Sequence, residues 1–312
     1  MRTFIHSFFI TALFVFAPAV RAETVIASIK PVSLIAAELL DGVAEVDTLL
    51  PEGASPHDFS LRPSDRRRLD SANLIIWVGA DTEPYLQRVI AAAQVSAISW
   101  QESAEEHAQH ADEHEHEHEH EHEHEHRESA AVDEGSHDEH DHAALHPWLS
   151  PESAEHFSER LAVKLKELFP ESSAKIDENE AKFLASLTSF ESAAQVQLAP
   201  VKERGFFVFH DAYQGLVEHF ELNQVGYFTL DPSRKPGAKH LTQLREQLEQ
   251  SSAQCVFVEP QYSPALIDSI TRGLDVKRGE LDPLATGIGV ASGGYIAFMQ
   301  GLLNQFTSCL TD

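Results

Sequence analysis

The amino-acid sequence predicts an α/β fold of two lobes, each a parallel sheet flanked by helices, joined by one long rigid helix. Two observations predict the lobes. Short β-branched runs alternate with helical patterns from Thr24 onward, and the same alternation returns after Gly205. A third observation predicts the connection, because a helical pattern of about 30 residues lies between the two alternating regions.

The elements follow in a regular order. In the first lobe the strands and helices read TVIASI, PVSLIAAELLDG, AEVDTLL, SDRRRLDSAN, LIIWVG, TEPYLQRVIAAA and VSAIS. In the second lobe they read FFVFH, AYQGLVEHFEL, NQVGYFTL, HLTQLREQLEQ, CVFVEP, SPALIDSITRGL, VKRGELDP and GYIAFMQGLLNQFTSCL. Strands separated by helices favour βαβ units, so both sheets are expected to be parallel.

Two helices are expected between the lobes. Ser150 and Pro151 suit an N-cap and a first helical position, while Pro170 and Pro200 mark the ends of the two segments. Apolar residues recur at helical spacing in the second segment: Ile176, Phe183, Leu184, Leu187 and Phe190. We therefore expect an N-terminal lobe over 23–170, a connecting helix over 171–200 and a C-terminal lobe over 201–312.

The N-terminus, MRTFIHSFFITALFVFAPAVRA, has the features of a secretory signal peptide. Its apolar run is shorter than the roughly 20 residues that a membrane-spanning helix needs. We expect cleavage near Ala22, which would make residues 1–22 the signal peptide and would export the mature protein. An uncleaved N-terminal anchor is the alternative.

Charge and cysteine content narrow the class of protein. The chain has 50 acidic and 23 basic residues and a formal net charge of −27, which disfavours nucleic acid as a partner and would concentrate divalent cations. The only cysteines are Cys255 and Cys309. In an oxidising compartment two cysteines are expected to form a disulfide, and they lack the spacing of a zinc site.

The segment over residues 102–142 differs from the rest of the chain. It contains 12 of the 19 histidines, including EHEHEHEHEHEHEH, with 17 acidic residues and one base, Arg127. With so few apolar residues to bury, it is expected to be a disordered insert that binds divalent metal at several weak sites. Its match to HExxH is a product of the alternation, because no apolar face supports a catalytic helix.

Three histidines outside the insert lie where ligands of parallel sheets usually bind. His57 follows the strand VDTLL, His210 ends GFFVFH, and His146 precedes the helix that starts at Ser150. Asp282 also follows a strand. Three imidazoles with a carboxylate or water suit tetrahedral zinc, although a lone histidine at a strand end is more often a hydrogen-bonded loop residue and Asp before Pro commonly opens a turn. Zinc binds neutral imidazole, so affinity should fall as pH drops through about 6.5.

Three other histidines, His156, His219 and His240, lie in helical patterns and are expected to be solvated or structural.

Five motifs follow one another along the chain: PEGASPHDFSLRPSD, then HPWLSPE after the histidine-rich insert, then FVFHDAY, VFVEPQYSP and GELDPL. In order and spacing they resemble the ZnuA-type periplasmic zinc receptors of ABC importers, over essentially the whole mature chain. The resemblance implies a metal site in the cleft between the lobes and delivery of Zn²⁺ to an inner-membrane ABC permease. It implies a receptor and not an enzyme, and we expect a monomer.

The resemblance also implies site residues. It assigns the metal ligands to His57, His146 and His210 and the disulfide to Cys255 and Cys309. Manganese and iron receptors of the superfamily commonly place a carboxylate where His210 stands, and a third imidazole suits zinc better. Some zinc receptors have a glutamate before the first ligand, where this chain has Pro56. The fourth ligand is therefore open between Asp282 and water.

Three alternative functions remain open at this point. One is a manganese or iron receptor of the same superfamily. Another is an exported zinc hydrolase, for which Glu259 or Asp211 would have to serve as the general base. The third is a zinc buffer with no membrane partner.

Overall fold

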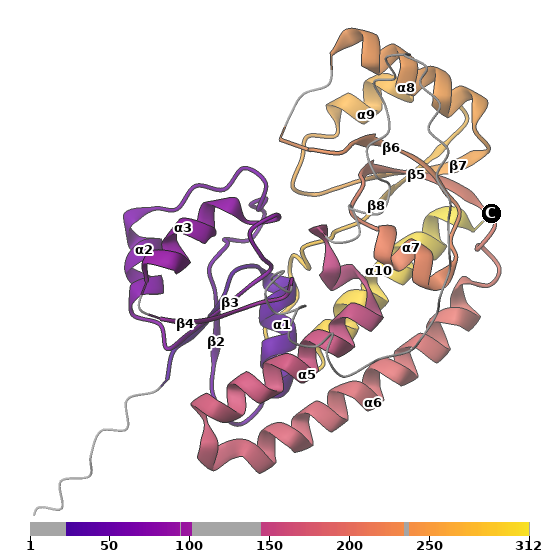
Figure 1. Ribbon diagram of the computed structural model, residues 1–312. Coiled ribbons are helices and arrows are strands. Elements are labelled where there is room, and N and C mark those ends of the chain that lie inside the picture. The colour runs from indigo at the N-terminus through magenta and orange to yellow at the C-terminus, as the bar shows by residue number, and fades with distance from the viewer. Residues whose placement is uncertain (1–22, 94, 102–144, 234–236, 312) are drawn as a thin grey trace, which may run out of the picture.

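The computed structural model describes residues 23–93, 95–101, 145–233 and 237–311. The expected signal peptide, 1–22, and the histidine-rich insert, 102–142, lie outside these residues. Two four-stranded sheets form the two lobes, and every strand pair in both sheets is parallel (Figure 1). The α/β fold with two parallel sheets that the sequence predicts is thus confirmed.

The N-terminal sheet has the strand order β2-β1-β3-β4. Its elements are β1 (Val25–Ala27), α1 (Lys30–Leu39), β2 (Val46–Thr48), α2 (Pro63–Asp70), β3 (Leu74–Trp77), α3 (Pro84–Ala92) and β4 (Ser96–Ser99). The C-terminal sheet has the equivalent order β6-β5-β7-β8. Its elements are β5 (Gly205–His210), α7 (Gln214–Phe220), β6 (Gln224–Thr229), α8 (Ala238–Gln250), β7 (Ala253–Val258), α9 (Ala265–Ile270), β8 (Lys277–Glu280) and α10 (Gly294–Leu310).

Two helices run between the sheets in the chain, α5 (Pro151–Leu168) and α6 (Ser173–Leu198), with the short 3-10 turns η3 (Pro147–Leu149) and η4 (Pro170–Ser172) before and between them. Ser150 caps α5 by accepting a hydrogen bond from the Ser153 amide, and Pro151 occupies the first turn, as the sequence predicts. At 26 residues, α6 spans about 39 Å and runs along both lobes (Figure 1).

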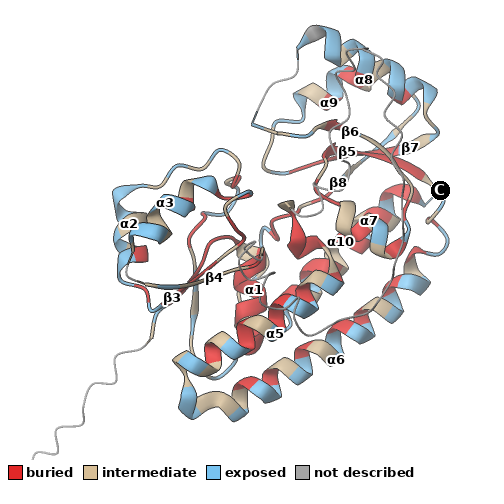
Figure 2. Cartoon of the chain, viewed as in Figure 1, coloured by how far each residue is buried: buried red, intermediate tan, exposed pale blue. Residues whose placement is uncertain are grey.

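One hydrophobic core extends from the first sheet to the second. It includes Val25 of β1, Ile176 and Phe183 of α6, Phe206 of β5 and Phe306 of α10. Successive residues of a strand face opposite sides, so Phe207 packs instead in a second core with residues of α8 and α9. Figure 2 shows buried residues along α1, α5 and α10 between the lobes. A continuous core of this kind limits independent movement of the lobes.

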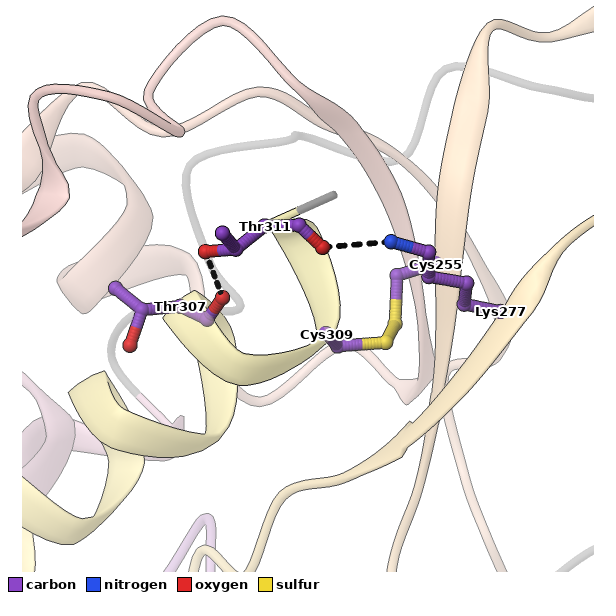
Figure 3. Close-up of a disulfide and its surroundings, with 5 residues drawn as sticks. All are labelled: Cys255, Lys277, Thr307, Cys309 and Thr311. Atoms are coloured by element: carbon purple, nitrogen blue, oxygen red, sulfur yellow. Dashed lines mark hydrogen bonds between the residues drawn. A yellow bond between two sulfur atoms is a disulfide. The ribbon is translucent and has the colours of Figure 1, made fainter.

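Helix α10 is attached to both lobes. At its start, the Glu38 carboxylate from α1 accepts hydrogen bonds from the Gly293 amide at 2.8 Å and the Tyr295 amide at 3.3 Å. Near its end, Cys309 forms the predicted disulfide with Cys255 of β7 (Figure 3). A carboxylate at a helix N-terminus and a covalent bond near the C-terminus together fix this helix against both sheets.

Candidate metal centre

His57 lies in the N-terminal lobe, in the loop that follows β2. Its backbone amide donates a hydrogen bond to the Ser55 hydroxyl oxygen at 3.2 Å. Ser55 itself is buried, at 6% exposure. This contact fixes the backbone just before the ring, so the imidazole is held toward the C-terminal lobe.

His146 immediately precedes η3, and its ring lies edge-on to Trp148, with 5.2 Å between the ring centroids. The Trp148 indole nitrogen donates a hydrogen bond to the Pro283 carbonyl at 2.8 Å, which anchors η3 to the loop after β8. On the other side of His146, the Leu145 carbonyl accepts a hydrogen bond from the Thr82 hydroxyl at 2.7 Å. The backbone is thereby held on both sides of the His146 ring.

His210 is the last residue of β5 and points its Nδ1 atom at a buried carboxylate. Nδ1 lies 2.7 Å from Oε1 of Glu259, which follows β7, and the Tyr213 hydroxyl donates to the same oxygen at 3.3 Å. Because a carboxylate only accepts, Nδ1 of His210 carries the proton and Nε2 presents its lone pair to the cleft. The other Glu259 oxygen, Oε2, is buried with no hydrogen-bond partner among the described residues.

The three rings converge from both lobes. Nε2 of His146 lies 3.2 Å from Nε2 of His210 and 3.4 Å from Nε2 of His57. One nitrogen from each ring lies within 4.8 Å of the other two, and this is the only such cluster in the described part of the chain. Two nitrogens bound tetrahedrally at 2.0–2.1 Å from zinc would be about 3.3 Å apart, so the first two distances match a tetrahedral edge.

The environment of His57 favours neutral imidazole. Burial, and secondly the nearby His210, lowers the pKa of His57 to about 4, while the Asp231 carboxylate opposes this change. His146 and His210 are 4% and 2% exposed. The cavity that the three rings line has a volume of about 10 Å³, which matches one ion or water molecule and excludes an organic substrate.

Asp282, the other candidate ligand, is engaged elsewhere. Its Oδ1 accepts hydrogen bonds from Gln261 Nε2 at 2.6 Å and from the Leu284 amide at 3.0 Å. Its Oδ2 accepts a hydrogen bond from the Thr286 amide at 2.5 Å. The carboxylate thus holds the loop after β8 in shape, and it is not part of the three-histidine cluster.

The remaining described histidines lie apart from the cluster. His219 Nε2 pairs with the Glu191 carboxylate at 2.8 Å, and His156 Nδ1 lies 3.8 Å from a Glu159 oxygen. His240 is exposed on α8. The sequence did not indicate two contacts that shape the site. Glu259 is a partner of His210 and not the general base that a hydrolase would need, and no sequence pattern points to Ser55.

Comparison with known proteins places the chain among zinc-uptake components. A family model described as ZnuA, "Zinc-uptake complex component A periplasmic", matches residues 25–309. The high-affinity zinc uptake system protein ZnuA of Yersinia pestis is 41% identical, and the match covers 93% of this chain and 92% of that protein. The protein of the same name from Haemophilus ducreyi is 39% identical, covering 92% of this chain and 93% of its own.

Solved structures share the fold. A zinc-bound deletion mutant of ZnuA has a TM-score of 0.71 at 21% identity, covering 94% of this chain and 99% of its own. The manganese complex of the solute-binding protein FpvC from Pseudomonas aeruginosa has a TM-score of 0.72 at 18% identity, covering 93% and 98%. Because the family model spans nearly the whole chain and two relatives are 41% and 39% identical over more than nine tenths of it, the protein belongs to the ZnuA family of zinc-uptake components.

Proposed function

We propose that this protein is a high-affinity periplasmic receptor that captures Zn²⁺ and delivers it to the permease of an ABC-type zinc importer. Zinc is the transported cargo and not a catalytic cofactor, so the protein is a receptor and not an enzyme. Membership of the ZnuA family supports this assignment over the whole chain. The observation that carries it is the spacing of 3.2 and 3.4 Å between imidazole nitrogens drawn from both lobes.

His57, His146 and His210 are the proposed ligands. With Nδ1 of His210 protonated and facing Glu259, its Nε2 is available to a metal, and the low pKa of His57 keeps that ring neutral at physiological pH. Water completes the tetrahedron in the proposed site. Asp282 is not the proposed fourth ligand, because its carboxylate lies outside the three-histidine cluster and accepts hydrogen bonds from Gln261, Leu284 and Thr286.

The metal proposed is zinc because three nitrogen ligands suit it better than the harder manganese ion, which prefers oxygen. The hydrolase alternative needs a general base beside a metal-bound water. Of the two bases considered, Glu259 is engaged by His210 and Tyr213, and Asp211 accepts a hydrogen bond from Gln224 at 2.8 Å. A cavity of about 10 Å³ also leaves no room for a peptide or ester.

The receptor would work in the periplasm, where its two lobes would close around zinc. Residues 1–22 would direct export to the periplasm, and no helix in the described residues is long and apolar enough to cross a membrane. The mature monomer would comprise the lobes 23–170 and 201–312 with the connecting helix 171–200. Since the ligands come from both lobes, zinc would favour a closed arrangement that an inner-membrane permease distinguishes from the empty one. The insert 102–142 would gather zinc when it is scarce.

Zinc uptake tests the proposal directly. Cells that lack their own zinc receptor would express this chain together with its cognate permease, and zinc accumulation would be measured in zinc-limited medium. We expect uptake with the wild type and with the control His219→Ala, whose side chain pairs with Glu191 away from the cavity. Uptake should be lost with His146→Ala. Uptake that persists without the permease, or with His146→Ala, would contradict the proposed function.

A further inference from the structure

The four residues 259–262, which directly follow β7, contact residues of both lobes at the metal centre without contributing a proposed ligand. Glu259 accepts the hydrogen bond from His210, and Gln261 donates to Asp282. Both of those contacts lie within the C-terminal lobe. The third contact crosses between the lobes, because the Tyr262 hydroxyl lies 2.5 Å from the hydroxyl of Ser55.

The contact between Ser55 and Tyr262 joins residues 207 positions apart in the sequence. On the N-terminal side, the Ser55 oxygen also accepts the hydrogen bond of the His57 amide. On the C-terminal side, the Tyr262 ring packs against Phe209, with centroids 4.9 Å apart, and Phe209 immediately precedes His210. Two short connections therefore run from the hydroxyl pair to proposed ligands on opposite lobes.

The position of this pair matters for release of the metal. Ser55 and Tyr262 both line the cavity, whose volume of about 10 Å³ fits a single ion closely between the two lobes. Among the ligands, His57 is more exposed than His146 and His210, so the loop that carries it is the wall best placed to open. Opening that loop away from the C-terminal lobe would break the contact between the hydroxyls of Ser55 and Tyr262.

We propose that the hydroxyl pair of Ser55 and Tyr262 is a latch that holds the His57 loop against the C-terminal lobe and sets the rate at which zinc leaves. This inference rests on the proposed zinc site. A single hydrogen bond between neutral hydroxyls is of modest net strength. Such a latch slows spontaneous loss of the ion and yet leaves the site easy to open when a permease pulls the lobes apart.

The test compares zinc dissociation from the mature protein and from Tyr262→Phe. The substitution keeps the ring on Phe209 and removes only the hydroxyl. Dissociation would be followed by stopped flow with an excess of chelator, at concentrations where the rate no longer depends on the chelator. We expect the rate to rise roughly two- to twelvefold, the range of one hydrogen bond, with no decrease in the association rate.

The matched control is Tyr85→Phe. It also removes a tyrosine hydroxyl from a hydrogen bond, to Glu83 at 3.0 Å, and keeps the ring that packs on Phe59. That bond lies within the N-terminal lobe, and neither of its residues lines the cavity. Its dissociation rate should equal that of the wild type. An unchanged rate in Tyr262→Phe, or an equal rise in both variants, would overturn the latch. A slower association rate would indicate a distorted site and would overturn it as well.

A measurement without zinc separates this inference from the proposed function. Hydrogen–deuterium exchange of the segment around His57 would be followed in the metal-free protein. We expect faster exchange in Tyr262→Phe than in the wild type and in Tyr85→Phe, because the acceptor of the His57 amide is no longer held. If exchange is faster in Tyr262→Phe but the wild type does not bind zinc, the proposed receptor function is refuted and the contact between the lobes is supported. Unchanged exchange beside normal zinc binding would refute the latch alone.

Discussion

The carboxylate of Glu259 should strengthen zinc binding, because it accepts a hydrogen bond from the proposed ligand His210. Glu259 is 3% exposed, and its Oε1 lies 2.7 Å from Nδ1 of His210. A buried negative charge beside the imidazole N–H fixes the tautomer and raises the basicity of the opposite nitrogen. Substitution of the carboxylate therefore changes zinc affinity without touching the ion.

Two substitutions divide this effect into its parts. In Glu259→Gln the amide oxygen can still accept the Nδ1–H bond, so the tautomer is kept and only the charge is lost. In Glu259→Leu the acceptor is lost as well. Removal of such partners typically costs 10- to 100-fold in metal affinity. We expect about tenfold weaker binding for the glutamine variant, or about 1.4 kcal/mol, and about hundredfold for the leucine variant.

The assay is competition against a chelator of known zinc affinity at pH 7.5, with the visible spectrum of the Co²⁺-loaded protein as a report on ligand geometry. Glu280→Gln, on the exposed side of β8, is the matched control and should bind zinc as the wild type does. If Glu259→Leu binds zinc within twofold of the wild type, the carboxylate does not tune His210 and the reasoning fails.

Three further predictions concern pH and stability. The pKa of His57 is about 4 in the folded protein and about 6.5 in the unfolded chain. Between these two pH values only the unfolded chain binds a proton at this residue. The metal-free protein therefore loses up to roughly 3 kcal/mol of stability as pH falls from 6.5 to 4. Urea unfolding at several pH values should show a shallower loss in His57→Ala, and an equal slope would contradict it. The disulfide joins Cys255 and Cys309, which are 54 residues apart, and so restricts the unfolded chain. Its reduction should lower the free energy of unfolding by about 4 kcal/mol. A decrease of less than about 1 kcal/mol would contradict this reasoning. Glu38→Ala should cost about 2 kcal/mol in thermal unfolding, because it leaves the buried Tyr295 amide and the amide of the N-cap residue Gly293 without their acceptor. The exposed Glu45→Ala should cost almost nothing, and equal effects would refute the capping role.

The lobes could be predicted because their signal is local. Each strand of the second lobe, such as the one ending at His210, is a short apolar run followed by a helical pattern, and parallel pairing follows from that alternation. The same rule brought His57 and His210 to the carboxyl ends of their sheets. The sequence can therefore predict that a residue lies at a strand end, even when it cannot predict which residues of the other lobe face it.

The contacts around the rings could not be predicted, since they depend on how the two lobes meet. Ser55 and Tyr262 are 207 residues apart, and no period in either segment relates them. The burial that lowers the pKa of His57 to about 4 likewise comes from the facing lobe, so an expectation based on free imidazole placed its titration near pH 6.5. The hydrogen bonds of Asp282 were equally hidden from the sequence, because they are made by a loop that bends back onto the carboxylate.

The central claim is that the histidine cluster between the lobes, and not the histidine-rich insert, is the working zinc site. A zinc competition titration against a strong chelator tests it most directly, with the mature protein compared to a variant that lacks residues 103–142 and to one in which His57, His146 and His210 are all alanine. We predict one tight site in the deletion variant and none in the alanine variant. Tight binding that disappears with the insert and survives in the alanine variant would contradict the account and favour a zinc buffer.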